Sequence, residues 1–180
     1  MIRYIAFLRA INVGGHTVKM DRLRALVAEL GFAKVETFIA SGNVIFETDT
    51  SDTCTLEKAM ERHLQQSLGY PVATFIRSPA EVAAAARFES FASEPSSPAH
   101  VQYIAFLPTQ PGDAAAEKVM SYRSAIDEFH VHGREVYWLC RTSMHESRFS
   151  AALLEKILGM PATLRNVTTV RKLAAKYAAE

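Results

Sequence analysis

The chain has 180 residues, with 20 Lys and Arg against 19 Asp and Glu. Its hydrophobic share of 49% excludes an intrinsically disordered chain, and no apolar run is long enough for a transmembrane helix. Two cysteines are too few for a disulfide framework or a zinc site, so we expect a protein of the reducing cytoplasm without a metal or cofactor. Residues 1–8 enter an apolar strand directly, which argues against a secretory signal. The net charge of +1 argues against a membrane or a nucleic acid as the main partner.

Two parts of the chain share one sequence pattern. Residues 4–8 (YIAFL) recur letter for letter as residues 103–107, and three weaker matches follow in the same order. These pair residues 41–46 with 132–137, 68–71 with 158–161, and 73–77 with 162–165. The ordered matches indicate an internal duplication, with extra residues near the start of the first copy.

Each copy predicts the same order of elements. In the first copy we expect strands at residues 3–8, 35–40, 44–47 and 72–77, where short apolar runs are rich in β-forming residues. Three helices complete the first copy. The first ends at Gly31, the second runs from Thr55 as N-cap to Leu68, and the third runs from Pro79 to Ala86.

In the second copy we expect strands at residues 101–107, 129–131, 135–140 and 162–165. Helices are predicted at residues 113–122, around residues 149–158 with Ser147 as a candidate N-cap, and at residues 168–178.

The order βαββαβ is typical of a ferredoxin-like unit. We therefore predict an α+β fold of two tandem ferredoxin-like units, each followed by an extra helix. The first unit spans residues 1–89 and the second residues 101–180. A flexible or extended linker rich in serine and proline joins them at residues 90–100.

The two copies differ most after their first strand. The second copy continues through a plain turn, whereas the first inserts a glycine-containing segment at residues 9–19. Glycine amides between a strand and a helix are suited to holding an anion, and Arg9 and Lys19 add positive charge. The alternative is that Gly14 and Gly15 only permit the chain to reverse.

A second difference is the basic C-terminal part of the chain. No acidic residue lies between Lys156 and Ala179, and Arg171 follows Arg165 closely enough to form one patch if the last helix folds back. Such a patch suits phosphate, although it is equally typical of a solvated helix face. The residues predicted to bind a ligand are Arg9, Asn12, Gly14, Gly15, Lys19, Ser41, Asn43, Arg165, Asn166 and Lys172.

Several of these stretches resemble one known family. Residues 8–15 (LRAINVGG) are similar to the LRGINVGG stretch near the start of members of the bacterial domain of unknown function family 1697. Residues 41–46, 133–137 and 165–173 also resemble that family, and Ala10 and Val167 stand where it usually has glycine and tryptophan. The resemblance implies a bacterial α+β protein in two parts, with no agreed activity, substrate or cofactor.

Three functions remain open from the sequence. The first is binding of a small anionic ligand, phosphate- or nucleotide-like, at the glycine segment. The second is an enzyme of unknown reaction with His16 as the candidate base. The third is a structural or interaction module that forms a homo-oligomer through exposed strand edges. His130 and His132 lack a third ligand and predict no metal site.

Overall fold

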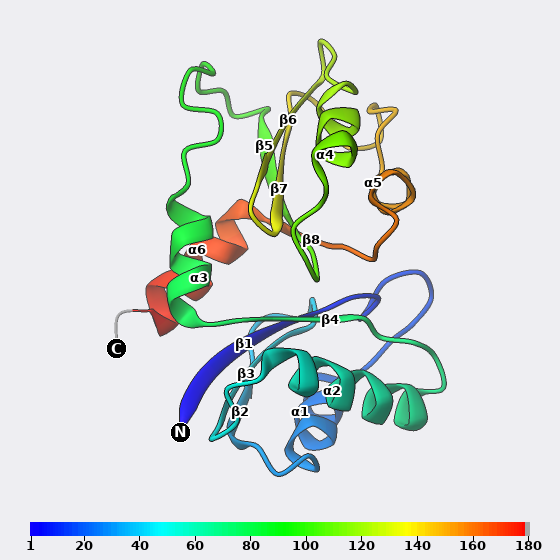
Figure 1. Cartoon of the computed structure of the whole chain (residues 1–180), viewed down its shortest axis with the longest axis vertical. Helices are drawn as coiled ribbons and strands as arrows, with labels where there is room; N and C mark the ends of the chain where they lie inside the picture. Colours follow the sequence, from blue (N-terminus) through cyan, green and yellow to red (C-terminus); the bar gives the residue numbers. More distant parts are fainter. Residues whose placement is uncertain (179–180) are drawn as a thin grey trace. The chain divides into compact units, whose positions relative to one another are not determined.

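The computed structural model describes residues 1–178. It is an α+β fold that contains, within these residues, two four-stranded antiparallel sheets and six helices (Figure 1). The chain divides into two compact units, one of residues 1–82 with 177–178 and one of residues 83–176. No helix of the described chain is long and apolar enough to cross a membrane. The expected division into a first unit of residues 1–89, a linker of residues 90–100 and a second unit of residues 101–180 stays a prediction.

The first unit contains two helices on one face of its sheet. Its elements are β1 (Ile2–Leu8), α1 (Met20–Ala28), β2 (Ala33–Thr37), β3 (Asn43–Thr48), α2 (Thr53–Leu68) and β4 (Thr74–Arg77). The strands lie in the order β2-β3-β1-β4, so β1 pairs with β3 and β4. Tyr4, Ala6 and Leu8 of β1 point toward the helices and join a buried core that includes Leu23 and Leu64.

The second unit repeats this arrangement. It contains β5 (Val101–Phe106), α4 (Asp113–Met120), β6 (Asp127–His132), β7 (Glu135–Cys140), α5 (Ala151–Leu158), β8 (Thr163–Asn166) and most of α6 (Val167–Tyr177). α3 (Pro79–Arg87) leads into it from β4. The strand order is β6-β7-β5-β8, and the apolar side chains of one sheet face pack with α4 and α5.

The pairing registers of the central strands β1 and β5 correspond, whereas the pair β2–β3 has an irregularity between Ala33 and Glu36 that the pair β6–β7 lacks. Ile5 pairs with Ile45 on one side and Arg77 on the other. Its counterpart Ile104 pairs with Tyr137 and Arg165. The matching letters at residues 4–8 and 103–107 therefore occupy the same place in the two sheets.

The helix ends show two corrections to the predicted caps. The N-cap of α2 is Asp52, whose carboxylate accepts the N–H groups of Cys54 and Thr55, so Thr55 lies inside the helix. The N-cap of α5 is Ser150, whose side chain accepts the N–H of Leu153. Ser147 was the wrong choice because its hydroxyl donates to Asp127, twenty positions earlier, at 2.7 Å.

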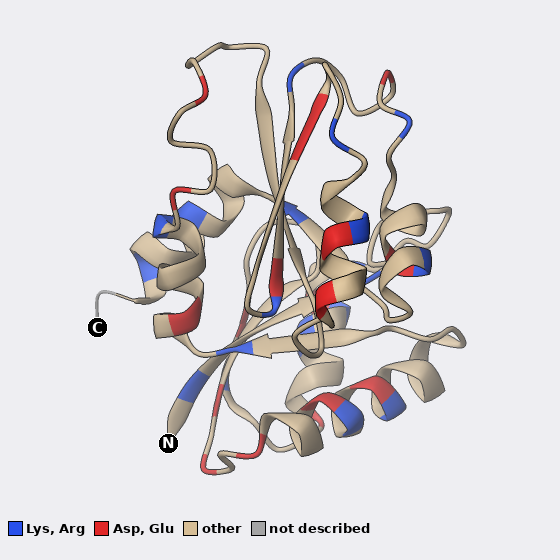
Figure 2. Cartoon of the chain, turned by 45° about the horizontal axis from the view of Figure 1, so that its top comes forward, with Lys and Arg blue, Asp and Glu red and all other residues tan. Residues whose placement is uncertain are grey.

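The outer edge of β4 is closed by α2. The N–H groups of Thr74 and Ile76 donate to the carboxylates of Glu61 and Glu57, at 2.9 and 2.8 Å. Figure 2 shows acidic and basic residues alternating along α2. Two of the strand's backbone donors are thereby withheld from pairing with another chain, and this disfavours oligomer formation through this edge.

Candidate functional site

The glycine segment, residues 9–19, links β1 to α1 and is fixed to the first unit at several points. Ile11 and Val18 are buried in its core. The Asn12 side chain donates from Nδ2 to the Ala40 carbonyl at 2.9 Å, and its Oδ1 accepts the Val18 N–H at 2.7 Å. Both functional groups of the Asn12 amide, which the sequence assigned to a ligand, thus hold the loop itself.

Backbone conformation accounts for the glycine pair. Gly14 and Gly15 have φ angles of 61° and 84°, and no other atom lies within 4 Å of where a Cβ would stand. Glycine is favoured at these positions by the left-handed backbone conformation. The close approach of another group plays no part. Ala10 and Asn12 adopt the same region at 60° and 56° without being glycine.

The candidate base His16 lies beside the ring of Tyr70. Their ring centroids are 3.8 Å apart and the rings are nearly parallel. Burial raises the pKa of Tyr70. The His16 side chain is therefore positioned by stacking on an aromatic ring.

Ser41 and Asn43 belong to the turn between β2 and β3. Asn43 is buried and donates from Nδ2 to the Phe38 carbonyl at 3.0 Å and to Ser41 Oγ at 2.9 Å. Gly42 packs so closely on Ile11 that an added Cβ would lie 2.9 Å from Ile11 Cβ. Ser41 and Asn43 thus hold the turn together, and Gly42 packs it against the glycine segment, which gives these residues a structural reason to be present.

Arg165 is buried in β8 and does not share the exposure of Arg9 and Lys19. Its Nη1 donates to Thr163 Oγ1 at 2.8 Å and to the Leu164 carbonyl at 2.9 Å. Burial lowers its pKa to about 10. Arg77, which pairs with Ile5 as Arg165 pairs with Ile104, is also buried, so each sheet has a buried arginine at this position of its edge strand.

The structure places a hollow of about 390 Å³ beside the segment predicted to be a linker. We call residues 90–100 the strap and this cavity the strap hollow; it lies between the strap and the start of α6. Its polar lining includes Ser97, His100, Gln102, Asn166, Thr168 and Arg171. The volume lies within the range of small-molecule sites. Of the predicted ligand-binding residues, the strap hollow includes Asn166.

The strap is attached to the second sheet by an ion pair. Arg141, at the end of β7, donates from Nε to Glu94 Oε2 at 3.2 Å and makes a second contact to the other carboxylate oxygen. These hydrogen bonds hold the pKa of Glu94 below its ordinary value and raise that of Arg141. The strap thus has a defined position on the second unit.

The free charge in the strap hollow is positive. Glu94 lines it but is paired with Arg141. Arg171 is exposed and has no hydrogen-bond or ion-pair partner among residues 1–178. A guanidinium of this kind in a concave site is suited to a phosphate or carboxylate oxygen.

A second hollow of about 580 Å³ adjoins the first and is lined by residues 86–92 with Gln102 and Arg171. Phe91, Gln102 and Arg171 line both. Phe91 thus adds an apolar ring to the lining of the hollows that the free guanidinium of Arg171 also lines. The combination can contact a ligand that has both an anionic group and a flat ring.

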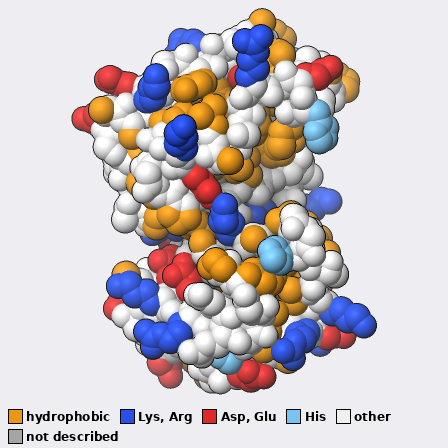
Figure 3. All heavy atoms as spheres, turned by 90° about the vertical axis from the view of Figure 1, so that its right-hand side faces the viewer, with side chains coloured by type: hydrophobic (Ala, Val, Ile, Leu, Met, Phe, Trp, Pro, Cys, Tyr) orange, Lys and Arg blue, Asp and Glu red, His pale blue; other side chains and the backbone are white. Residues whose placement is uncertain are grey.

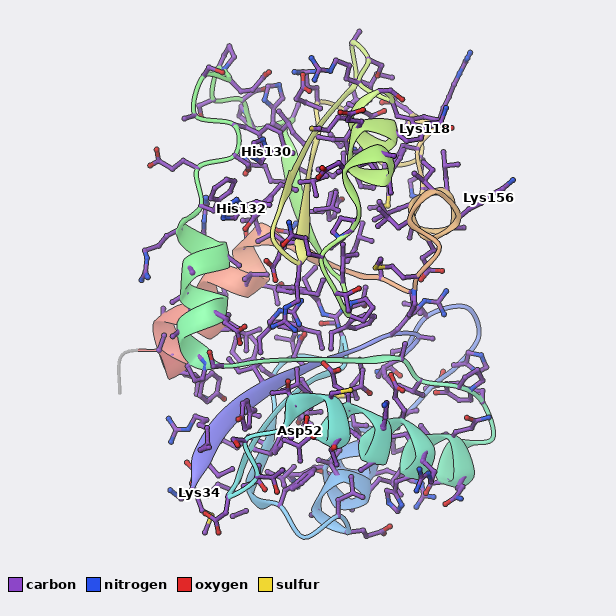
Figure 4. All side chains as sticks on the ribbon, in the orientation of Figure 1. Lys34, Asp52, Lys118, His130, His132 and Lys156 are labelled. Atoms are coloured by element: carbon purple, nitrogen blue, oxygen red, sulfur yellow. The ribbon has the colours of Figure 1, made fainter. Side chains whose placement is uncertain are left out.

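His130 and His132 lie on one side of β6, facing the segment after α3 (Figure 4). His132 stacks on Phe88 at 4.2 Å between ring centroids, and His130 lies 5.3 Å from the same ring. No group of three His, Cys, Asp or Glu side chains within residues 1–178 is arranged to hold a metal ion.

Sequence reasoning missed Phe91, His100 and Gln102 as site residues. The serine and proline content of the strap indicated a linker, and nothing local in the sequence shows that Glu94 meets Arg141, 47 positions later. The basic C-terminal part did indicate Arg171. Lys172, its neighbour, is exposed and lies outside the lining of both hollows.

Residues 1–137 match the family model described as "Protein of unknown function (DUF1697)". The chain belongs to this family. The resemblance seen in the sequence is thereby confirmed. The matched part of this DUF1697 chain includes the glycine segment and the strap, while Asn166, Thr168 and Arg171 follow it.

A solved structure supports the fold over nearly the whole DUF1697 chain. It is the conserved bacterial protein SP0830 from Streptococcus pneumoniae, which is 24% identical with a TM-score of 0.72 over 99% of each chain. At this identity the likeness concerns the fold alone. No curated protein matches the chain.

Proposed function

We propose that this protein binds a small anionic ligand, phosphate- or nucleotide-like, in the strap hollow, with Arg171 as the anion-binding group. The observation that carries the proposal is the unpaired guanidinium of Arg171 in a cavity of ligand size. α6 adds two further basic side chains and no acidic one, and basic positions recur along it (Figure 2).

The lining indicates how such a ligand is oriented. An anionic group at Arg171 occupies a hollow that is also lined by the polar side chains of His100, Gln102 and Thr168. A base or another flat ring has Phe91 as its apolar contact at the boundary of the two hollows. Arg141 compensates the charge of Glu94, the acidic residue of the strap hollow, whereas Glu89 lines the adjoining hollow.

We further propose that the two units are tandem ferredoxin-like copies, each followed by an extra helix. The identical strand orders and the corresponding registers of Ile5 and Ile104 support this. In this view the strap hollow forms on the second copy, where residues 90–100 and α6 are additions to the shared framework.

The glycine segment stays a predicted anion site, with Arg9 and Lys19 as its exposed cations. The strap hollow has the stronger support, because the side chains of Asn12, Ser41 and Asn43 take part in hydrogen bonds within the first unit. We do not propose an enzymatic role, because the arrangement of these side chains does not point to a particular reaction.

The proposal can be tested by isothermal titration calorimetry of the full chain at low salt. The ligands are inorganic phosphate, adenosine monophosphate, and adenosine as the uncharged match. We expect Arg171→Gln to weaken binding of the two anions about tenfold or more, as loss of a charge-assisted hydrogen bond does. Lys156→Gln, which removes the same charge from α5, is the control; Lys156 points outward in Figure 4.

Lys172→Gln separates the strap hollow from a general basic patch on α6. If the hollow is the site, this variant changes the affinity less than threefold or so, within the range of exposed charge effects. Equal losses for Arg171→Gln and Lys172→Gln, or no saturable binding of either anion, would refute the proposal.

A further inference from the structure

A separate pocket of about 470 Å³ lies in the second unit at the C-terminal end of α4. We call it the α4–β6 pocket, because the turn between these elements forms one wall and the loop before α5 forms another. Its apolar lining comprises Tyr122, Ile126 and Phe149, and its polar lining includes Ser124, Asp127 and Arg148. Figure 3 shows apolar side chains reaching the surface between basic ones on the α4–α5 side of this unit.

The aromatic wall of the pocket is held in place by the core. Phe149 is 4% exposed and packs against Phe129 at 4.4 Å and Trp138 at 5.4 Å between ring centroids. Tyr122 meets Phe149 edge to face at 5.8 Å and remains 36% exposed. A planar apolar ligand therefore finds a preformed aromatic surface, which reduces the ordering cost of binding.

Asp127 lines the pocket but its carboxylate is already engaged. Oδ1 accepts the indole N–H of Trp138 at 2.8 Å, and Oδ2 accepts the hydroxyl of Ser147 at 2.7 Å. The side chain is buried, with 4% of the residue exposed. Asp127 thus fixes the walls to each other and is not the group that selects a ligand.

Arg148 is the free ionic group of the pocket. It is exposed, and within the described residues its guanidinium has no hydrogen-bond or ion-pair partner. Arg141 lies behind the same wall, since its Nη1 donates to the carbonyls of Ser124 and Ala125. Because Arg141 is already paired with Glu94 and also lies 3.8 Å from Glu128, Arg148 supplies the positive charge that suits an anion at the rim.

We propose that the α4–β6 pocket binds a small aromatic carboxylate. The ring contacts Tyr122 and Phe149, and the carboxylate accepts hydrogen bonds from Arg148. This site is independent of the strap hollow, and its ligand differs in being mainly apolar.

The probe is phenylacetate, added to the isotope-labelled full chain and followed by amide chemical shifts. 2-Phenylethanol supplies the same ring without charge, and phenethylamine supplies it with the opposite charge. We expect a dissociation constant on the order of millimolar for phenylacetate, typical of a ligand of this size, with shifts at residues 122–127 and 147–149. The two matched compounds bind about tenfold more weakly or worse.

Two exposed positions allow variants that keep the core intact. Arg148→Gln should weaken phenylacetate binding about tenfold and leave that of 2-phenylethanol unchanged. Tyr122→Ala should weaken both, while Lys156→Gln and Arg171→Gln change neither. The pocket assignment is overturned if 2-phenylethanol binds as tightly as phenylacetate, if Arg148→Gln has no effect, or if the shifts fall elsewhere.

Discussion

Replacing Ala10 by glycine should stabilise the protein. Ala10 has a φ of 60°, and this left-handed conformation costs an L-residue roughly 1–2 kcal/mol because its Cβ crowds the following carbonyl. Glycine removes that strain but has more freedom in the unfolded chain, which costs roughly 0.5–1 kcal/mol. The difference between these ranges is roughly 0–1.5 kcal/mol, so we predict a net gain of about 0.8 kcal/mol in the free energy of unfolding. The same geometry explains the glycine of the LRGINVGG stretch at this position.

Urea denaturation followed by circular dichroism measures this change, with Ala25→Gly as the matched control. Ala25 is exposed within α1, so glycine there should destabilise by about 1 kcal/mol through loss of helix propensity. The same substitution thus has opposite effects at two positions of one unit. If Ala10→Gly destabilises the protein as much as Ala25→Gly does, residue 10 does not adopt the left-handed conformation and the reasoning is refuted.

Three further predictions concern contacts that hold the fold. Asn12→Ala should lower the free energy of unfolding by roughly 1–2 kcal/mol in the same assay, since two loop hydrogen bonds are lost. The double variant Glu57→Ala and Glu61→Ala should show concentration-dependent association in light scattering, because the β4 edge is opened; a strict monomer would contradict this. The folded pKa of Glu94 lies below its ordinary 4.5, so its ion pair with Arg141 stabilises the strap above pH 4.5 and is lost as the pH falls through the lower value. Acidification should therefore speed hydrogen exchange in residues 90–100, relative to the intrinsic rate at each pH, in wild type but not in Glu94→Gln.

Much of the element order could be predicted because it follows from local patterns. The strand at residues 135–140 was placed as the structure has it, since β-forming apolar residues there follow the Gly133 turn. Strand β2 was displaced: it ends at Thr37, and Ile39 adopts a φ of 52°, which no sequence rule predicts for a β-branched residue.

The site was harder to predict because it depends on distant contacts. The composition of the strap indicates a linker, and its ion-pair partner Arg141 lies 47 positions after Glu94, just beyond the end of β7. Arg165 looked available for a ligand because its burial is not visible in the sequence, although the matching Arg77 in the first copy was a usable indication of a structural role.

The most direct test of the central claim is chemical-shift mapping of adenosine monophosphate on the labelled full chain. We predict that the shifts concentrate in residues 91–102 and 166–171, which include the lining of the strap hollow, and that Arg171→Gln, by weakening binding about tenfold, reduces them severalfold at the same subsaturating ligand concentration. Shifts confined to residues 9–19, or unchanged shifts in Arg171→Gln, would contradict the assignment of the anion to the strap hollow.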